Sequence, residues 1–469
     1  MSREVEVAII GAGSAGLYAL SQVRRHTGSY LLFDGGTLGT TCARVGCMPS
    51  KVLIQVADDF HRRHHHAAMG IAGGADLRVR GAEVLAHLRR LRDGFVEGVL
   101  GSGRFYQGEH FVPANVRFVD THTLETADGE RVQARRIVIA TGSRPVVPAP
   151  WRDLGERLLT TDTLFELEDL PASVAVIGLG AVGLEVGQAL ARLGVRVTGV
   201  DQLTRIGGLD DEAVNATALE VIGEEFPLWL GTGADVQRTT DGRLAVSAGH
   251  HDTTVDAVVA SLGRRPNLDA LDLPAAGVGL DERGHPAYDP HTLRIENSDI
   301  YIAGDCNAER PLLHEAAFEG RVAGYNAVRD EPMAFRRQVP IAITFCSPNI
   351  ATVGTRFSSL AAEAIVIGES PLDGSGRARI IGEPRGLIRV YAEKATGRVL
   401  GATLFAPQAE HLAHLLAWSI DAEQTVADLL ARPFYHPTLE EALQDALAHA
   451  AKQVNTPAQD WPTGLRPLD

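Results

Sequence analysis

The stretch VEVAIIGAGSAG, residues 5–16, decides how the chain begins to fold. Its apolar run predicts a strand over residues 5–10, and Gly11, Gly13 and Gly16 follow at the spacing G-x-G-x-x-G. Glycines at this spacing permit a tight turn, close approach of a pyrophosphate and close packing of the next helix on the strand. We expect that helix over residues 17–25. The strand after it, residues 30–33, ends at Asp34, where a ribose-binding acid belongs.

The same unit recurs in the middle of the chain. A strand over residues 174–177 leads into GLGAVG, with its glycines at Gly178, Gly180 and Gly183. A helix over residues 184–193 and a strand over residues 196–200 are expected to follow, ending at Asp201. The first glycine and the acid are 23 residues apart in both units. The sequence therefore predicts an α/β fold with two Rossmann-like dinucleotide-binding domains.

Two cysteines stand close together in GTTCARVGCMPSK, residues 39–51. A short loop or a distorted helical turn can bring Cys42 and Cys47 within the roughly 7 Å between Cα atoms that a disulfide needs. Such a short ring restrains the unfolded chain little, which favours a redox role over a structural one. Lys51 and a helix N-terminus would both favour thiolate over thiol. A pair of buried, unreactive thiols is the alternative interpretation of the two residues alone.

This segment resembles the GGTCxxxGCxPSK signature of the flavin-dependent pyridine nucleotide–disulfide oxidoreductases, most closely their dihydrolipoamide dehydrogenase branch. The resemblance extends over essentially the whole chain, through ATGS at residues 140–143, GRxPN at residues 263–267 and HPT at residues 436–438. The chain departs from the family pattern at Thr40, where a glycine is usual, and at Asn349, where a glutamate is common.

The resemblance implies two cofactors, FAD in the first unit and NAD in the second. Asp201 would accept hydrogen bonds from a ribose and repel a 2′-phosphate, so we expect NAD rather than NADP, although the nearby Arg205 could soften the preference. The cofactor-binding residues implied in this way are Gly11, Gly13, Gly16, Asp34, Thr41, Lys51, Thr141, Gly142, Ser143, Asp305, His314, Gly178, Gly180, Gly183, Glu185, Asp201, Val236 and Gly263.

The resemblance also assigns the catalytic residues. Cys42 would form a mixed disulfide with the substrate, and Cys47 would pass the electrons to FAD. His436 would act as the base and Glu441 would orient it; in the family this pair comes from the other subunit. The expected protein is a homodimer that oxidises dihydrolipoamide, free or on a lipoylated carrier protein, and reduces NAD⁺ to NADH.

The implied domain order is an FAD-binding domain in two parts (residues 1–148 and 267–340), an NAD-binding domain (residues 149–266) and an α+β dimerisation domain (residues 341–469). The net charge of −15 on 469 residues argues against binding to nucleic acid or to an anionic membrane. Four cysteines and no long apolar run lead us to expect a cytoplasmic protein.

Three alternatives bear on these expectations. A metal site at His61, His64, His65 and His66 is disfavoured, because consecutive helical residues point in different directions. A related NAD(P)H-dependent reductase of another small disulfide stays open, although mercuric reductases carry a further cysteine pair near the C-terminus and here Cys346 is the last cysteine. A redox-sensing flavoprotein without turnover would need neither the cysteine pair nor His436 and Glu441.

Overall fold

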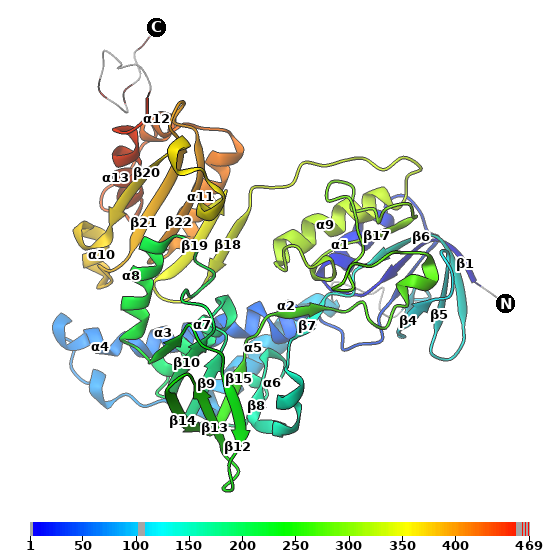
Figure 1. The fold of residues 1–469 in the computed structure, drawn as a ribbon, viewed down its shortest axis with the longest axis horizontal. Helices are drawn as coiled ribbons and strands as arrows, with labels where there is room; N and C mark the ends of the chain where they lie inside the picture. The colour runs from blue at the N-terminus through cyan, green and yellow to red at the C-terminus, as the bar shows by residue number, and fades with distance from the viewer. Residues whose placement is uncertain (1–2, 102–107, 456–461, 463–464, 466–467, 469) are drawn as a thin grey trace.

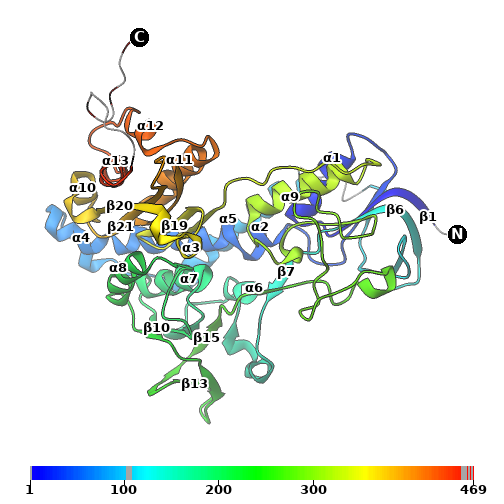
Figure 2. The ribbon, with the colours of Figure 1, turned by 45° about the horizontal axis from the view of Figure 1, so that its top comes forward.

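The structure is a computed structural model that describes residues 3–101, 108–455, 462, 465 and 468. In Figure 1 the first sheet lies on the right, the second sheet lies below it and to its left, and the third sheet lies above the second. Long helices, α3 and α5, connect the first region to the other two (Figure 2).

The first sheet contains the N-terminal dinucleotide unit. Its parallel part has the order β3–β2–β1–β6, with β17 also pairing with β6, and β5 and β4 extend it in antiparallel fashion. The last four residues of β1 are fully buried, as expected for a parallel strand covered on both faces. The strands are β1 (Arg3–Ile10), β2 (Tyr30–Phe33), β3 (Phe111–Val112), β4 (Val116–Phe118), β5 (Thr123–Thr126), β6 (Arg131–Ile139) and β17 (Ile300–Ile302).

Helices α1 (Ser14–Val23) and α9 (Leu313–Asn326) lie against each other on one face of this sheet (Figure 1). The chain then leaves the sheet through α2 (Thr41–Val45), α3 (Cys47–His61), α4 (Arg63–His66) and α5 (Gly81–Gly101). The apolar side of α3, at Leu53 and Ala57, is buried in the same hydrophobic core as the second dinucleotide unit. The helix that starts at Cys47 is therefore packed on the nucleotide-binding domain that follows it in sequence.

The second sheet is parallel, in the order β11–β10–β9–β15–β8, and a small antiparallel sheet, β12–β13–β14, flanks it. The strands are β8 (Leu158–Leu159), β9 (Ser173–Ile177), β10 (Arg196–Asp201), β11 (Leu228–Leu230), β12 (Asp235–Arg238), β13 (Leu244–Ala248), β14 (His251–Val255) and β15 (Ala257–Ala260). The helices are α6 (Thr161–Leu164), α7 (Ala181–Arg192) and α8 (Glu212–Gly223). The chain enters and leaves this region through an antiparallel pair, β7 (Ser143–Pro145) and β16 (Arg264–Pro266).

The third sheet is antiparallel, in the order β18–β19–β22–β21–β20, and contacts α11 and α13. Its strands are β18 (Ile341–Thr344), β19 (Asn349–Gly354), β20 (Ile365–Pro371), β21 (Leu387–Glu393) and β22 (Val399–Ala406). The helices of this region are α10 (Gly376–Ile381), α11 (Ala409–Asp421), α12 (Val426–Leu430) and α13 (Glu440–Ala451). The expected fold class, two Rossmann-like units and an α+β domain, is confirmed.

The helix starts are the main difference from the expected elements. Helices predicted from residues 17 and 184 begin at Ser14 and Ala181, because each is capped by the middle glycine of its motif, Gly13 or Gly180. Alternating residue types over residues 115–130 predict a small antiparallel sheet, and β4 and β5 pair in this way. The polar helical stretch after Asp58 is broken, since α3 ends at His61 and α4 begins at Arg63.

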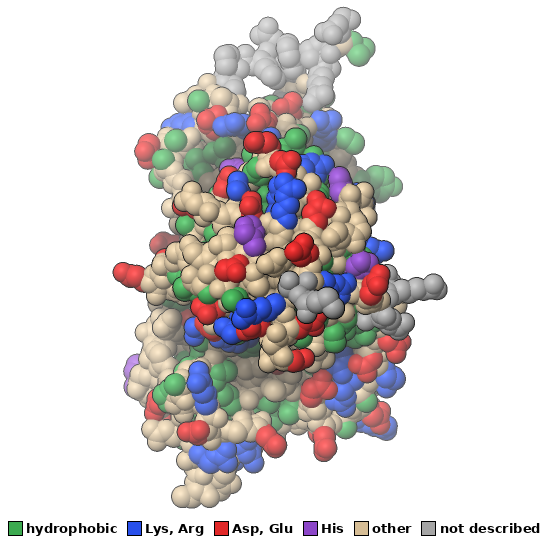
Figure 3. Space-filling model, turned by 90° about the vertical axis from the view of Figure 1, so that its right-hand side faces the viewer, with side chains coloured by type: hydrophobic (Ala, Val, Ile, Leu, Met, Phe, Trp, Pro, Cys, Tyr) green, Lys and Arg blue, Asp and Glu red, His purple; other side chains and the backbone are tan. Residues whose placement is uncertain are grey.

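On the face shown in Figure 3, acidic and basic side chains are interspersed over the first region, and no broad surface of one sign is visible. In the part of the chain that the structure describes, no helix has the length and apolar character needed to cross a membrane.

Candidate active site

The two glycine motifs form matching cradles. A Cβ atom at Gly11 would lie 2.3 Å from the carbonyl oxygen of Ala140, and one at Gly16 would lie 1.8 Å from that of Gly11. In the second unit, the same atoms at Gly178 and Gly183 would lie 2.3 Å from the oxygen of Ser261 and 1.8 Å from that of Gly178. Any side chain at these four positions would clash with backbone. At the middle glycines, Gly13 and Gly180, a Cβ would meet nothing within 4 Å, so the space that a pyrophosphate needs is open.

The acids at the strand ends are held in the same way in both units. Asp34 accepts hydrogen bonds from the backbone N–H groups of Ala12 (2.7 Å) and Gly36 (2.8 Å). Asp201 accepts from Leu179 (2.6 Å) and Leu203 (2.8 Å). Each carboxylate is thereby fixed beside its glycine turn, with further lone pairs able to accept from a ribose hydroxyl.

Two buried hydroxyls lack partners beside these cradles. Among the described residues, neither Thr141 Oγ1 nor Ser261 Oγ has a hydrogen-bond partner. Thr141 follows Ala140, which contacts Gly11, and Ser261 contacts Gly178 and Gly183. Because buried polar groups are normally paired, these hydroxyls fit the binding of a polar ligand in each cradle. The residues present therefore fit one dinucleotide at each unit.

The crossing between the two domains converges on a carboxylate. Ser143 Oγ donates to Asp305 Oδ2 (2.7 Å), and Arg264 Nε donates to the same hydroxyl (2.7 Å). Sequence reasoning did not single out Arg264, although GRxPN contains it. Gly142 and Gly263 adopt positive φ angles at the matching ends of the crossing, +66° and +90°. His314 lies exposed at the N-terminus of α9.

The two thiols sit on consecutive helices. Cys42 is the second residue of α2, and Cys47 is the first residue of α3 after Gly46. Both are free thiols in this structure. The N-cap of α2 is Thr40, whose side chain accepts from Ala43 N–H (3.2 Å) although its φ of +60° and ψ of 149° suit glycine. The family's glycine at this position therefore has a conformational reason, and the threonine here compensates partly by capping the helix.

The two thiols differ strongly in acidity. A hydrogen bond from Cys42 and the charge of Lys51 lower the pKa of Cys47 from 9.0 to about 6, against the effect of burial. The hydrogen bond to Cys47 and burial raise the pKa of Cys42 well above its ordinary value. At neutral pH the reduced pair is therefore a thiolate at Cys47 with a proton on Cys42.

Lys51 lies one turn after Cys47, where it is paired with an acid of the second domain. Its Nζ donates to both oxygens of Glu185, at 2.9 and 2.7 Å, and lies 4.6 Å from the centre of the Phe345 ring. Glu185 also accepts from the backbone N–H of Phe345 (2.8 Å). Three regions of the chain thus meet at the lysine nearest the thiols.

His436 and Glu441 form the expected pair. His436 Nδ1 lies 2.9 Å from Glu441 Oε1, and Glu441 Oε2 accepts from the backbone N–H of Thr438 (3.0 Å). The hydrogen bond from His436 lowers the pKa of Glu441. The His436 side chain is 81% exposed. Among the described residues, no hydrogen bond or ion pair joins this pair to Cys42 or Cys47 of the same chain, and α13 lies away from α2 in both ribbon views (Figures 1 and 2).

Thr41, Val236 and Asn349 were singled out from the sequence, and Cys306 is a third cysteine of the chain. Val236 is buried on β12, so any contact with a nucleotide would involve its backbone, and Thr41 is exposed at the start of α2. Asn349 donates to the carbonyl oxygen of Cys346 (2.6 Å), which keeps the side chain within its own loop. Cys306 is fully buried, and burial raises the pKa of its thiol to about 12. Within the described ranges, no three His, Cys, Asp or Glu side chains are placed to hold a metal ion.

Comparison with known proteins identifies this arrangement. The family model described as pyridine nucleotide-disulphide oxidoreductase matches residues 5–320, and the model of its dimerisation domain matches residues 340–447. A dihydrolipoyl dehydrogenase of Haloferax volcanii is 32% identical, covering 96% of each chain. A mercuric reductase of Shigella flexneri is also 32% identical, covering 97% of this chain and 82% of that protein.

Solved structures share the fold. LpdA from Mycobacterium tuberculosis superposes with a TM-score of 0.83 at 24% identity, covering 95% of this chain and 99% of that one. The Cu(II) complex of the HOCl-induced flavoprotein disulfide reductase RclA from Escherichia coli gives 0.82 at 20% identity, covering 96% and 99%. The C-terminal match supports a homodimer. The expected family is confirmed: the chain belongs to the pyridine nucleotide-disulphide oxidoreductases and is a flavoprotein oxidoreductase with a disulfide redox centre that uses FAD and NAD(H).

Proposed function

We propose that the protein is a dihydrolipoyl dehydrogenase, which oxidises dihydrolipoamide to lipoamide and reduces NAD⁺ to NADH. The observation that carries the proposal is the polarised thiol pair, Cys42 and Cys47. The curated relatives named dihydrolipoyl dehydrogenase, which align over almost the full chain, support the choice of substrate.

The difference in thiol acidity gives the reaction a direction. In the oxidised enzyme a substrate thiolate attacks the disulfide, and the sulfur with the lower pKa leaves faster. Attack on Cys42 therefore expels Cys47 as a thiolate, which Lys51 stabilises, and forms a mixed disulfide between Cys42 and the substrate. The second thiolate of the substrate then attacks the substrate sulfur that is bonded to Cys42. Cys42 leaves and takes up a proton, and lipoamide is released.

The two electrons gained by the thiol pair must reach the nucleotide. When bound, FAD would supply the two-electron redox chemistry that links the dithiol to NAD⁺. The residues that would hold it are those of the first cradle together with Asp34, Thr141, Ser143 and Asp305. The second cradle and Asp201 would hold NAD⁺ in preference to NADP⁺, because a buried carboxylate repels a 2′-phosphate.

Dihydrolipoamide must lose protons before its sulfurs can attack. His436 is the base in this proposal, and the carboxylate of Glu441 fixes its tautomer and stabilises its charged form. Since His436 is exposed and, among the described residues, no hydrogen bond or ion pair joins it to the thiols of its own chain, the base would serve the thiols of the partner subunit. Each active site would then need both subunits of the homodimer.

Steady-state kinetics test the substrate directly. Dihydrolipoamide with NAD⁺ is compared with glutathione disulfide and NADPH, and with mercuric ion and NADPH, using the same FAD-loaded enzyme. We expect kcat/KM to be highest for dihydrolipoamide with NAD⁺ and to be lost in Cys42→Ser. A higher value for either of the other pairs would replace the proposed substrate while leaving the oxidoreductase family unchanged.

A further inference from the structure

Two ion pairs connect the helix of the redox thiols to the helix of the nucleotide cradle. Lys51 on α3 pairs with Glu185 on α7 at 2.7 Å, and Asp58 on α3 pairs with Arg192 on α7 at 2.5 Å. The two pairs are seven residues apart on each helix, about 10 Å along the axis. Because the partners follow in the same chain order on both helices, α3 and α7 run parallel, with the Cys47 end beside the Gly180 end.

The two ion pairs place their positive charges on different helices. The cation lies on α3 in the first pair and on α7 in the second. If the helices were antiparallel in the same place, Lys51 would face Arg192 and Asp58 would face Glu185, two like-charge contacts. The pairs therefore favour one direction and one register, which the apolar contacts of Leu53 and Ala57 alone do not specify.

Arg192 is hydrogen-bonded to residues of all three domains. Its side chain is 7% exposed, and it donates to Asp58 of the FAD-binding region, to both oxygens of Glu225 in its own domain (2.8 and 2.7 Å), and to the carbonyl oxygen of Ser347 in the dimerisation domain (2.9 Å). Planar, fixed donors of this kind suit one arginine and cannot be reproduced by lysine.

The dimerisation domain is hydrogen-bonded to α7 beside the same two ion pairs. Phe345 N–H donates to Glu185, and Ser347 N–H donates to Gln188 Oε1 (2.8 Å). The carbonyl oxygen of Ser347 accepts from Gln188 Nε2 (2.8 Å) as well as from Arg192. Glu185, Gln188 and Arg192 lie on one side of α7, three and four residues apart, so one helix face sets the position of both neighbouring domains.

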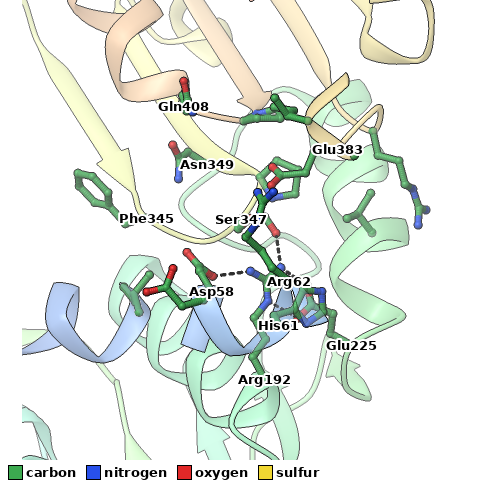
Figure 4. A pocket seen from close by; sticks show the side chains of 18 of the residues that line it. Asp58, His61, Arg62, Arg192, Glu225, Phe345, Ser347, Asn349, Glu383 and Gln408 are labelled. Carbon is green, nitrogen blue, oxygen red and sulfur yellow. Dashed lines mark hydrogen bonds and ion pairs between the residues drawn. The ribbon is translucent and has the colours of Figure 1, made fainter. Parts of the chain in front are cut away.

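A cavity borders the second pair. Asp58, Arg192 and Glu225 line a cavity of about 900 Å³ together with Ser347, Asn349 and Glu383. Figure 4 shows these side chains. Packed side chains do not fill this side of the pair, so the hydrogen bonds themselves hold Asp58 against Arg192. Among the described residues, loss of the Asp58 carboxylate would leave Lys51–Glu185 as the ion pair between α3 and α7, beside the apolar contacts of Leu53 and Ala57.

We propose that Asp58 and Arg192 are positioning residues: they hold the thiol-bearing helix in register with the nucleotide-binding helix, and hydride transfer between the nicotinamide and the flavin depends on this register. The cysteines and FAD belong to the same domain, whereas the nicotinamide nucleotide is bound by the other one. A lost register should therefore impair the nucleotide half-reaction and spare the thiol half-reaction.

Stopped-flow measurement of the two half-reactions tests this in the FAD-loaded enzyme. In Asp58→Ala we expect flavin reduction by NADH to slow about tenfold, since small misplacements of reacting groups are costly, while reduction by dihydrolipoamide stays within about twofold of the wild type. Asp59→Ala is the matched control, because Asp59 is the next residue on α3 and, within the described part of the chain, its carboxylate accepts only from Gln55 (3.1 Å). Asp58→Asn, which keeps an acceptor for Arg192, should recover part of the lost rate.

Backbone hydrogen exchange of the FAD-loaded enzyme gives a second readout that does not depend on turnover. Exchange should rise over residues 51–61 and 185–192 in Asp58→Ala and stay unchanged in Asp59→Ala. Equal loss in both half-reactions, or no change in either, would overturn the proposal, and so would faster exchange without slower reduction by NADH. Reduction of the flavin by NADH does not involve dihydrolipoamide. This half-reaction therefore tests the proposal even if dihydrolipoamide is not the substrate.

Discussion

The thiol pair and the His436–Glu441 pair differ in how many of the groups that they need for catalysis lie beside them in the same chain. Cys42 and Cys47 lie on consecutive helices between two domains, hydrogen-bond to each other and have Lys51 one turn away. His436 is 81% exposed, and among the described residues its only hydrogen-bond partner is Glu441, five residues further along. The redox centre is thus preorganised within a single chain, whereas the proposed base is oriented by Glu441 but is not joined to the thiols of its own chain by a hydrogen bond or ion pair among the described residues. This contrast is what a catalytic site shared between two subunits requires.

The largest effect is expected at the attacked sulfur. Cys42→Ser should abolish flavin reduction by dihydrolipoamide, because a serine hydroxyl cannot form the mixed disulfide. Flavin reduction by NADH should continue, since that step does not need a sulfur at residue 42. Anaerobic stopped-flow absorbance distinguishes the two, and residual reduction by dihydrolipoamide at the wild-type rate would remove Cys42 from the reaction.

Removal of the base should have a smaller effect. His436→Ala should slow reduction by dihydrolipoamide by at least about 10²-fold, the lower end of what a general base contributes, and leave reduction by NADH unchanged. Glu441→Gln should lie between this variant and the wild type, because it keeps a hydrogen-bond partner for His436 but removes the charge. Equal losses in both half-reactions would place His436 outside the thiol chemistry.

Cys42 and Cys47 differ in pKa, and a pH titration can measure this difference. Cys47 is a thiolate above about pH 6 and becomes protonated as the pH falls through that value, because its pKa is lowered from 9.0. Alkylation of the reduced protein by iodoacetamide should therefore reach half its maximal rate near pH 6 at Cys47, and only at strongly alkaline pH at Cys42. Lys51→Met should move the Cys47 midpoint upward. A midpoint near 9 in the unmodified protein would contradict the assigned polarity.

The smallest effect is expected at the start of the thiol segment. Thr40 adopts a conformation that favours glycine and also caps α2 through its side chain. Thr40→Gly removes roughly 1–3 kcal/mol of backbone strain and loses a few tenths of a kcal/mol of capping, so unfolding free energy should rise by about 1 kcal/mol. Urea denaturation measures this difference. A decrease would mean that the cap outweighs the strain.

Local motifs predicted the parts of the molecule that depend on neighbouring residues. The glycine spacing identified both cradles, and the run of apolar residues identified β1, β2 and β9 to within two residues at each end. The helix starts were placed three residues late, because the capping glycines already belong to the turn. The strain at Thr40 was not visible in the sequence, since a φ angle depends on how α2 joins the preceding loop.

Contacts between distant segments could not be read in this way. Nothing local to Asp58 or Arg192 indicates that the two side chains meet, because they are 134 residues apart and their pairing depends on how α3 packs on α7. The same holds for Arg264, which reaches Ser143 only after the chain has crossed twice between domains. Residue type and spacing predict a site's chemistry, whereas domain packing decides which side chains hold it together.

Subunit mixing tests the shared site most directly. Inactive Cys42→Ser and His436→Ala dimers are mixed under conditions in which exchange of subunits is demonstrated independently, and dihydrolipoamide oxidation is measured. A heterodimer would contain one site with both residues and one with neither, so random exchange should restore up to about a quarter of wild-type activity. No recovery after complete exchange would show that Cys42 and His436 of one site come from the same chain.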